Sequence, residues 1–179
     1  MAQSGAAARR YAQAVFEIAK RDGTLDRWRA DLALLNQIFG NEAVAQALED
    51  PKMEDEGKRN LVRGLLARQQ VQPLAVNLIL MLVERNRIHL LPRVVEHFDR
   101  MYNKEMGIVI AEVTTAVPLD PAHRNHVAKH IANLTGAKRV ELRVKVDPSI
   151  LGGIVAKIED ELIDASVASR LAELAQRIA

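Results

Sequence analysis

The chain has 179 residues, 49% of them apolar but only 3% aromatic, so its core must be built from aliphatic side chains. It contains no cysteine, which excludes disulfides, thiolate nucleophiles and cysteine-ligated metal sites. The 25 basic and 23 acidic residues are interleaved and leave a net charge of +2, which argues against a nucleic-acid-binding stripe. The longest strong apolar run, Leu78 to Val83, is far shorter than the roughly 20 residues that span a bilayer.

The N-terminal part of the chain carries the hydrophobic spacing of helices separated by short loops. Gly23 is a stop signal for the first helix, and Thr24 and Asn41 are predicted N-caps of the next two. Pro92 lies in the first turn of the last helix, where proline is tolerated. We predict a compact bundle of six helices over residues 6–20, 24–39, 41–50, 54–68, 73–85 and 89–104.

The first of these helices is rich in alanine and arginine, as a transit peptide can be. Its apolar spacing is regular, however, and Glu17 and Asp22 belong to it. We therefore interpret it as a helix of the folded protein. A start without a cleavable segment favours a bacterial over an organellar source.

The pattern changes from helical spacing to alternation near Gly107. A helix is predicted from Asp120 to Leu134, closed by Gly136, and an alternating strand over 139–147. A further strand is predicted before that helix. Its inward face is expected to consist of Val109, Ala111, Val113, Thr115 and Val117.

The stretch LGGIVAKI at 151–158 raises the question of a phosphate-binding loop. No third glycine stands at dinucleotide-fold spacing, no Lys-Ser or Lys-Thr follows, and the glycines lead into a strand rather than a helix. They therefore indicate a bend at a strand start. We predict a hairpin with a short strand at 162–163, turning at 159–160, and a last helix over 166–178.

Together these elements indicate an α+β protein of two domains. Residues 1–105 are expected to form an N-terminal six-helix bundle. Residues 106–179 are expected to form a small α/β domain with a short sheet and two helices.

Three histidines, His123, His126 and His130, fall on one face of a predicted helix, and the last two have the i, i+4 spacing of a metal-ligand pair. No glutamate follows His126 to complete a metalloprotease motif. Val127, Ile131 and Leu134 beside the histidines resemble a core stripe. We interpret them as solvated histidines at the edge of the core. We expect no catalytic residue, no cofactor and no metal ligand.

Two predicted helices carry more apolar surface than an ordinary bundle helix. The helix over 73–85 is apolar almost all round until Glu84. On the first helix, two apolar stripes cover roughly 200°, about twice the width that a surface helix requires. Both helices lie centrally in the bundle, or part of their combined surface forms a groove for a partner's amphipathic helix. The first stripe of the first helix, which we assign to the core, consists of Ala8, Ala12, Val15, Phe16 and Ala19, and the second stripe consists of Ala7, Tyr11, Ala14 and Ile18.

Trp28 is the only tryptophan of the chain and stands between Arg27 and Arg29. A half-buried anchor is one interpretation. A contact with a partner is the other, because tryptophan is frequent at the centre of interfaces.

Three blocks of the sequence resemble, in order, the delta subunit of F-type ATP synthases, called the oligomycin-sensitivity-conferring protein in mitochondria. They are ARRYAQAVFEIAKRDGTLDRW (8–28), NLILMLVERNRIHLLPRVVEHF (77–98) and VKVDPSILGGIVAKIEDELIDASVASRL (144–171). One block alone is a weak signal, but three in the family's order are specific. The resemblance covers essentially the whole chain.

The resemblance implies a non-catalytic subunit of the peripheral stalk, which links the catalytic head to the membrane-anchored b subunits and resists rotor torque during proton-driven ATP synthesis. The N-terminal bundle is expected to bind the amphipathic N-terminal segment of an alpha subunit, and the C-terminal domain the b subunits. The expected location is peripheral, at the cytoplasmic face of a bacterial cell membrane. With Trp28 added, the expected alpha-binding residues are Tyr11, Ala14, Ile18, Trp28, Asn77, Leu78 and Met81.

Two alternatives belong to other classes of protein. An all-helical RNA-binding adaptor is suggested by Arg85, Arg87 and Arg93, which lie close together in the sequence. The scarcity of aromatic residues for base stacking and the acids among the bases argue against it. A small metal-binding enzyme built on the histidine face is the least favoured.

Overall fold

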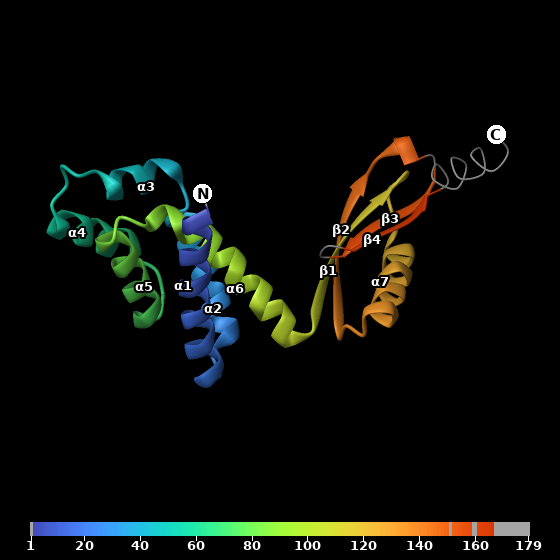
Figure 1. Cartoon of the computed structure of the whole chain (residues 1–179), viewed down its shortest axis with the longest axis horizontal. Coiled ribbons are helices and arrows are strands. Elements are labelled where there is room, and N and C mark those ends of the chain that lie inside the picture. Colours follow the sequence, from blue (N-terminus) through green and yellow to red (C-terminus); the bar gives the residue numbers. More distant parts are fainter. Residues whose placement is uncertain (1, 151, 159–160, 167–179) are drawn as a thin grey trace. The chain divides into compact units, whose positions relative to one another are not determined.

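The computed structural model describes residues 2–150, 152–158 and 161–166, and side-chain environments from residue 5 to residue 158 with the same gaps (Figure 1). Its contacts divide the chain into two compact units, Met1–Tyr102 and Asn103–Ala179. The division falls inside helix α6 (Leu91–Met106), whereas the sequence suggested a boundary near its end, at 105/106.

The described part of the first unit is helical (Figure 1). The helix expected over 89–104 is divided into a 3-10 turn and α6, and its Pro92 lies in the first turn of α6. Ahead of these two elements stand α1 (Ala2–Arg21), α2 (Leu25–Phe39), α3 (Glu42–Glu49), α4 (Asp55–Leu66) and α5 (Pro73–Glu84), and the 3-10 turn is η1 (Ile88–Leu90).

Helix α2 supplies the largest buried side chain in the described part of the first unit, together with a buried phenylalanine and two buried leucines. Each is at most 2% exposed, so the single tryptophan is buried rather than half-buried as one interpretation had it. The helix begins without the expected cap, because the Thr24 side chain makes no capping hydrogen bond. Asn41 does cap α3, accepting a hydrogen bond from the Ala43 amide at 2.9 Å. The buried residues of α2 in question are Trp28, Leu32, Leu35 and Phe39.

Helix α1 packs into the unit through small side chains. Ala8, Ala12 and Ala19 are fully buried, and small residues at a helix contact allow the axes to approach closely. Phe16 adds an edge-to-face contact with Phe98 of α6, with ring centroids 5.9 Å apart. One face of α1 is therefore committed to the core.

A polar cluster joins α2 to α6. Arg29 donates to Asp99 at 3.1 Å, and its guanidinium lies 4.5 Å from the centroid of the Tyr102 ring. The Tyr102 hydroxyl donates a hydrogen bond to Asp26, and this bond raises the pKa of the phenol. The cluster fixes α2 against α6 on the side of α2 that carries Asp26.

The second unit contains a four-stranded sheet in the order β2-β1-β3-β4. Strands β1 and β2 are parallel and are connected through α7, whereas β3 pairs with β1 and β4 pairs with β3 in antiparallel fashion. The elements are β1 (Ile108–Thr115), α7 (Pro121–Thr135), β2 (Arg139–Val146), the 3-10 turn η2 (Pro148–Ile150), β3 (Gly153–Ile158) and β4 (Glu161–Ser166).

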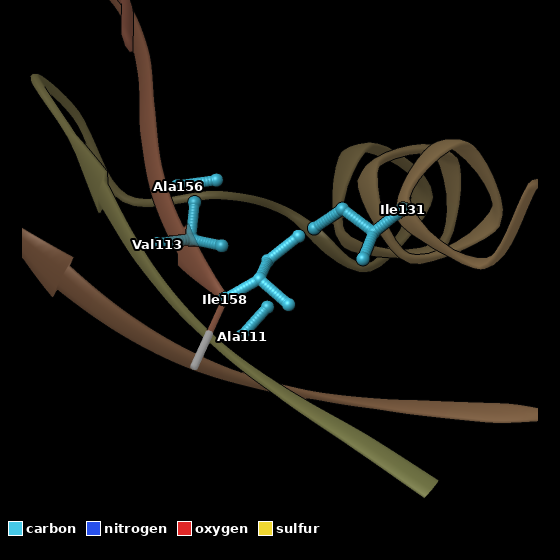
Figure 2. Close-up of a cluster of buried hydrophobic side chains, with 5 residues drawn as sticks. All are labelled: Ala111, Val113, Ile131, Ala156 and Ile158. Carbon is cyan, nitrogen blue, oxygen red and sulfur yellow. The ribbon is translucent and has the colours of Figure 1, made fainter. Parts of the chain in front are cut away.

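Five buried side chains from the sheet and α7 form the core of this unit (Figure 2). In Figure 2, Ile131 extends from the helix toward the strand residues, which confirms it as the core position of α7. Strand β1 ends at Thr115, so Val117 does not share its inward face and is 65% exposed, contrary to the prediction. The core residues are Ala111, Val113, Ile131, Ala156 and Ile158.

The turns of the second unit follow local chemistry. Gly107, between α6 and β1, has a φ of +66°, and Gly153 starts β3 with a φ of +80°, both in the region that favours glycine. The paired glycines therefore lie at the start of a strand, as expected. The predicted turn at 159–160 lies outside the described residues, as do residues 167–178 of the helix predicted over 166–178. Ser166, the expected start of that helix, is instead the last residue of β4, and the expected short strand at 162–163 is part of the same strand.

Helix α7 has a side-chain cap at its start and a glycine at its end. The Asp120 carboxylate accepts a hydrogen bond from the His123 amide at 2.7 Å, and this bond lowers the pKa of the carboxyl. Gly136, with a φ of +69°, closes the helix through a bond from its amide to the Ala132 carbonyl. Both signals were read correctly from the sequence.

The lowered pKa of Asp120 gives a pH-dependent prediction. A carboxyl with a lowered folded-state pKa adds stability above its unfolded value of about 3.9, and that stability is lost as the pH falls through the folded value. Asp120→Ala should lower the melting temperature of the chain at pH 7, and its difference from the parent protein should shrink below about pH 4. Thermal unfolding followed by circular dichroism measures both.

Asp120→Asn is the matched control, because asparagine caps helices without a charge. It should retain most of the parent stability at pH 7. A difference between Asp120→Ala and the parent that is the same at pH 7 and pH 3 contradicts the assignment.

Candidate partner-binding groove

An open apolar groove lies on the first unit and is formed by α1, α2 and α5. Its volume is about 330 Å³. All seven residues proposed from the sequence as alpha-binding residues line it, so the structure brings residues from three separate helices to one place. Val15 and Leu74 complete the lining, which consists of Tyr11, Ala14, Val15, Ile18, Trp28, Leu74, Asn77, Leu78 and Met81.

The two residues missed by the sequence interpretation had local signals. Leu74 stands four positions before Leu78 and three before Asn77, which places the three on one helical face. Val15 follows Ala14 and was assigned to the core stripe of the first helix. It is 5% exposed, so it contributes to both the core and the groove.

Burial separates the floor of the groove from its walls. Trp28 and Leu78 are 2% and 4% exposed and form the floor. Leu74 is 48% exposed and Met81 38% exposed, so these two large apolar side chains face the open side. Exposed apolar surface of this kind, gathered around a concave site, is typical of a binding surface.

The groove offers little chemistry. Tyr11 is the one ionisable side chain among its lining residues, and Arg87, just beyond α5, donates a long hydrogen bond of 3.5 Å to the Tyr11 hydroxyl. This contact places the C-terminal end of α5 beside Tyr11 of α1. A lining without a carboxylate, histidine or lysine provides no acid–base pair.

A second apolar groove of about 260 Å³ lies between α7 and β3. His126 and His130 are exposed at this groove. Leu134 beside them is 59% exposed, so it does not belong to the core stripe as predicted. Val127, Ile131, Ile154 and Ala156 provide the rest of the lining.

The histidine face does not converge on one point. The His123 ring is bonded instead to Asp120, with 2.8 Å between Nδ1 and the carboxylate oxygen. Among residues 2–150, 152–158 and 161–166, no group of three histidine, cysteine or acidic side chains is placed to hold a metal ion. In the same residues, no helix is both long and apolar enough to cross a membrane.

The fold and this groove define a class: a helix-rich α+β protein whose open apolar site fits binding rather than catalysis. The chain belongs to the ATP synthase delta (OSCP) subunit family, whose sequence pattern matches residues 7–178. This confirms the resemblance seen in the three sequence blocks.

Relatives from bacteria and plants match over nearly all of the chain. The ATP synthase subunit delta of Trichlorobacter lovleyi is 34% identical over 96% of this chain and 95% of its own length. The subunit of the same name from Synechococcus sp. strain JA-3-3Ab is 36% identical over 94% of this chain and 93% of its own. The chloroplastic delta chain of Sorghum bicolor is 34% identical over 94% of this chain and 70% of its own.

The fold also matches a solved relative. A chain in the cryo-EM structure of the Toxoplasma gondii mitochondrial ATP synthase hexamer superimposes with a TM-score of 0.70 at 25% identity, over 96% of both chains. This likeness supports the mostly helical α+β architecture with a small sheet.

The assignment of Leu78 to the floor and Leu74 to a wall predicts unequal losses of stability when each of these α5 leucines is substituted. Leu78→Ala should lower the free energy of unfolding by about 2–5 kcal/mol, because Leu78 is buried in the floor. Leu74→Ser should change it by no more than about 0.5 kcal/mol, because Leu74 is half exposed. Urea unfolding of the two variants measures the difference. Equal costs contradict the assignment of Leu74 to an open wall.

Proposed function

We propose that this protein is a non-catalytic stator subunit of the peripheral stalk of an F-type ATP synthase. Its first unit binds the amphipathic N-terminal helix of an alpha subunit, and its second unit binds the b subunits of the stalk. The observation that carries the proposal is the gathering of Tyr11, Ala14, Ile18, Trp28, Asn77, Leu78 and Met81 in one apolar groove of a chain from the delta family.

Helix-in-groove binding suits the shape and chemistry of this site. An amphipathic helix presents an apolar stripe at i, i+3, i+4 and i+7, which an elongated apolar groove can accept. The occupant would cover the exposed parts of Leu74 and Met81, and Ala14, also on the open side, is small enough to let a helix approach. Buried apolar area contributes about 25 cal/mol per Å², from which the costs of association are subtracted.

The mechanical role follows from the same contact. The rotor exerts torque on the catalytic head, and a stator must hold the head with contacts that persist for many turnovers. Differences in affinity between related interfaces lie mostly in the dissociation rate, so a well-packed apolar contact gives the required persistence. No reactive side chain is needed, and a groove without acid–base pairs is sufficient.

The second unit completes the link to the membrane. We assign the contact with the b subunits to this unit, whose groove between α7 and β3 is lined by apolar side chains. The protein then lies peripherally at the cytoplasmic face of the bacterial membrane, held there through the complex and supporting proton-driven ATP synthesis.

Substitution of Ala14 tests the alpha-binding proposal. Ala14→Asp places a carboxylate on the open side of the groove, where the partner's apolar stripe would have to bury it. The affinity for a peptide of the alpha-subunit N-terminus should fall about tenfold or more, while the chain stays folded. Isothermal titration calorimetry measures the affinity, and circular dichroism the fold.

Ala33→Asp is the matched control, since Ala33 is exposed on α2 and does not line the groove. It should leave the affinity unchanged. Equal affinities for Ala14→Asp and Ala33→Asp contradict the placement of the alpha helix, and absence of peptide binding by the parent protein contradicts the proposed function.

A further inference from the structure

Asp31 of α2 is a buried carboxylate outside the groove lining. It is 6% exposed, and its Oδ2 accepts a hydrogen bond of 3.2 Å from the backbone amide of Gln72. Gln72 is the N-cap residue of α5, and its own side chain makes no capping hydrogen bond. The start of α5 is therefore bound by a residue from another helix, 41 positions earlier in the chain.

Three neighbouring positions at the start of α5 do not use the Asp31 carboxylate. Pro73 has no amide hydrogen, and the amides of Ala75 and Val76 donate to the Gln72 carbonyl at 3.0 and 3.2 Å. The Gln72 amide is thus the donor that Asp31 satisfies. A carboxylate at this position is also favoured by the partial positive charge at a helix N-terminus.

This single bond connects the floor of the groove to one of its walls. Asp31 follows Trp28 by three residues on α2, so the two stand one turn apart. Gln72 precedes Leu74 by two residues, and the next turn of α5 carries Asn77. The bond therefore joins the residue just before the first turn of α5 to the part of α2 that carries Trp28.

We propose that Asp31 is a positioning residue for the groove: its bond to the Gln72 amide sets the distance between the α5 wall and Trp28. This inference rests on the proposed function for its effect on partner binding, but its effect on groove geometry does not require a partner. Loss of the bond frees the first turn of α5, which widens the groove at Leu74 and exposes Trp28.

The binding experiment compares Asp31→Ala, Asp31→Asn and Asp26→Asn in the full chain. Asp31→Ala should weaken binding of the alpha-subunit N-terminal peptide about tenfold or more, and Asp31→Asn, which keeps an acceptor oxygen, should restore most of the affinity. Asp26→Asn is the control on the same helix, because Asp26 is bonded to Tyr102 and does not line the groove. It also keeps an acceptor for the Tyr102 hydroxyl, so it should leave both the midpoint of urea unfolding and the affinity close to the parent values.

A second readout in the free protein separates this inference from the proposed function. Trp28 is the only tryptophan, so intrinsic fluorescence reports on the groove floor alone. Asp31→Ala should shift the emission to longer wavelength and speed hydrogen exchange of the Gln72 amide, and Asp31→Asn should do so less. These two measurements test the role of Asp31 without any partner. If the parent protein binds no peptide, the proposed function is overturned, but the role of Asp31 in groove geometry is still decided.

Three outcomes overturn the inference. The first is fluorescence emission and Gln72 amide exchange in Asp31→Ala that equal those of the parent protein. The second is a parent protein that binds the peptide and an Asp31→Ala variant that binds it equally well. The third is a loss of affinity in Asp26→Asn equal to that in Asp31→Ala. If Asp31→Ala does not fold, the free-protein readouts of the two asparagine variants replace it. Asp31→Asn should then show a small emission shift and faster Gln72 exchange that Asp26→Asn lacks, and parent-like values in both variants overturn the inference.

Discussion

Close packing of α1 through its alanines is the constraint on which the first unit depends. Ala8, Ala12 and Ala19 are fully buried, and their size lets α1 approach the rest of the unit closely. A core with few aromatic side chains needs such close approach, because aliphatic residues fill less volume. With one face of α1 in the core, three residues of its second apolar stripe are left to form a wall of the groove, Tyr11, Ala14 and Ile18. Ala7, the first residue of that stripe, is buried instead.

Helix α2 supports both sides of this arrangement. Its apolar side chains Leu32 and Phe39 form the interior, and Trp28 reaches the groove floor. Its polar side chains bind other helices at two places, Asp26 to Tyr102 of α6 and Asp31 to the start of α5. Trp28, Leu78 and Val15 belong to both the core and the groove, whereas the wall residues Leu74 and Met81 are partly exposed. Substitutions in the groove walls can therefore separate binding from stability.

Much of the architecture could be predicted because its signals are local. Asn41, Asp120 and Gly136 mark helix ends through contacts with residues close by in the chain. Tyr11, Ala14 and Ile18 could be found because the two apolar stripes of α1 exceeded what a core requires, whereas Asn77, Leu78 and Met81 were implied by the family resemblance. The stripes alone could not distinguish a groove from a central position in a bundle, since that depends on which helices meet.

The features that sequence interpretation missed depend on tertiary contacts or on competing local geometry. Thr24 has the right chemistry for a cap, but its backbone places the side chain where it makes no capping bond. Val117 continues the alternation of β1 beyond the point where pairing ends, so period alone extended the strand too far. Asp31 finds its partner 41 positions away, and no spacing rule predicts that pairing.

The central claim is that the groove between α1, α2 and α5 holds a partner's amphipathic helix. An NMR experiment on the full chain, bound to an isotope-labelled peptide of the alpha-subunit N-terminus, tests it most directly. The account predicts intermolecular contacts from the peptide's apolar side chains to Ala14, Leu74 and Met81. Contacts confined to the groove beside α7, or to no groove at all, would contradict it.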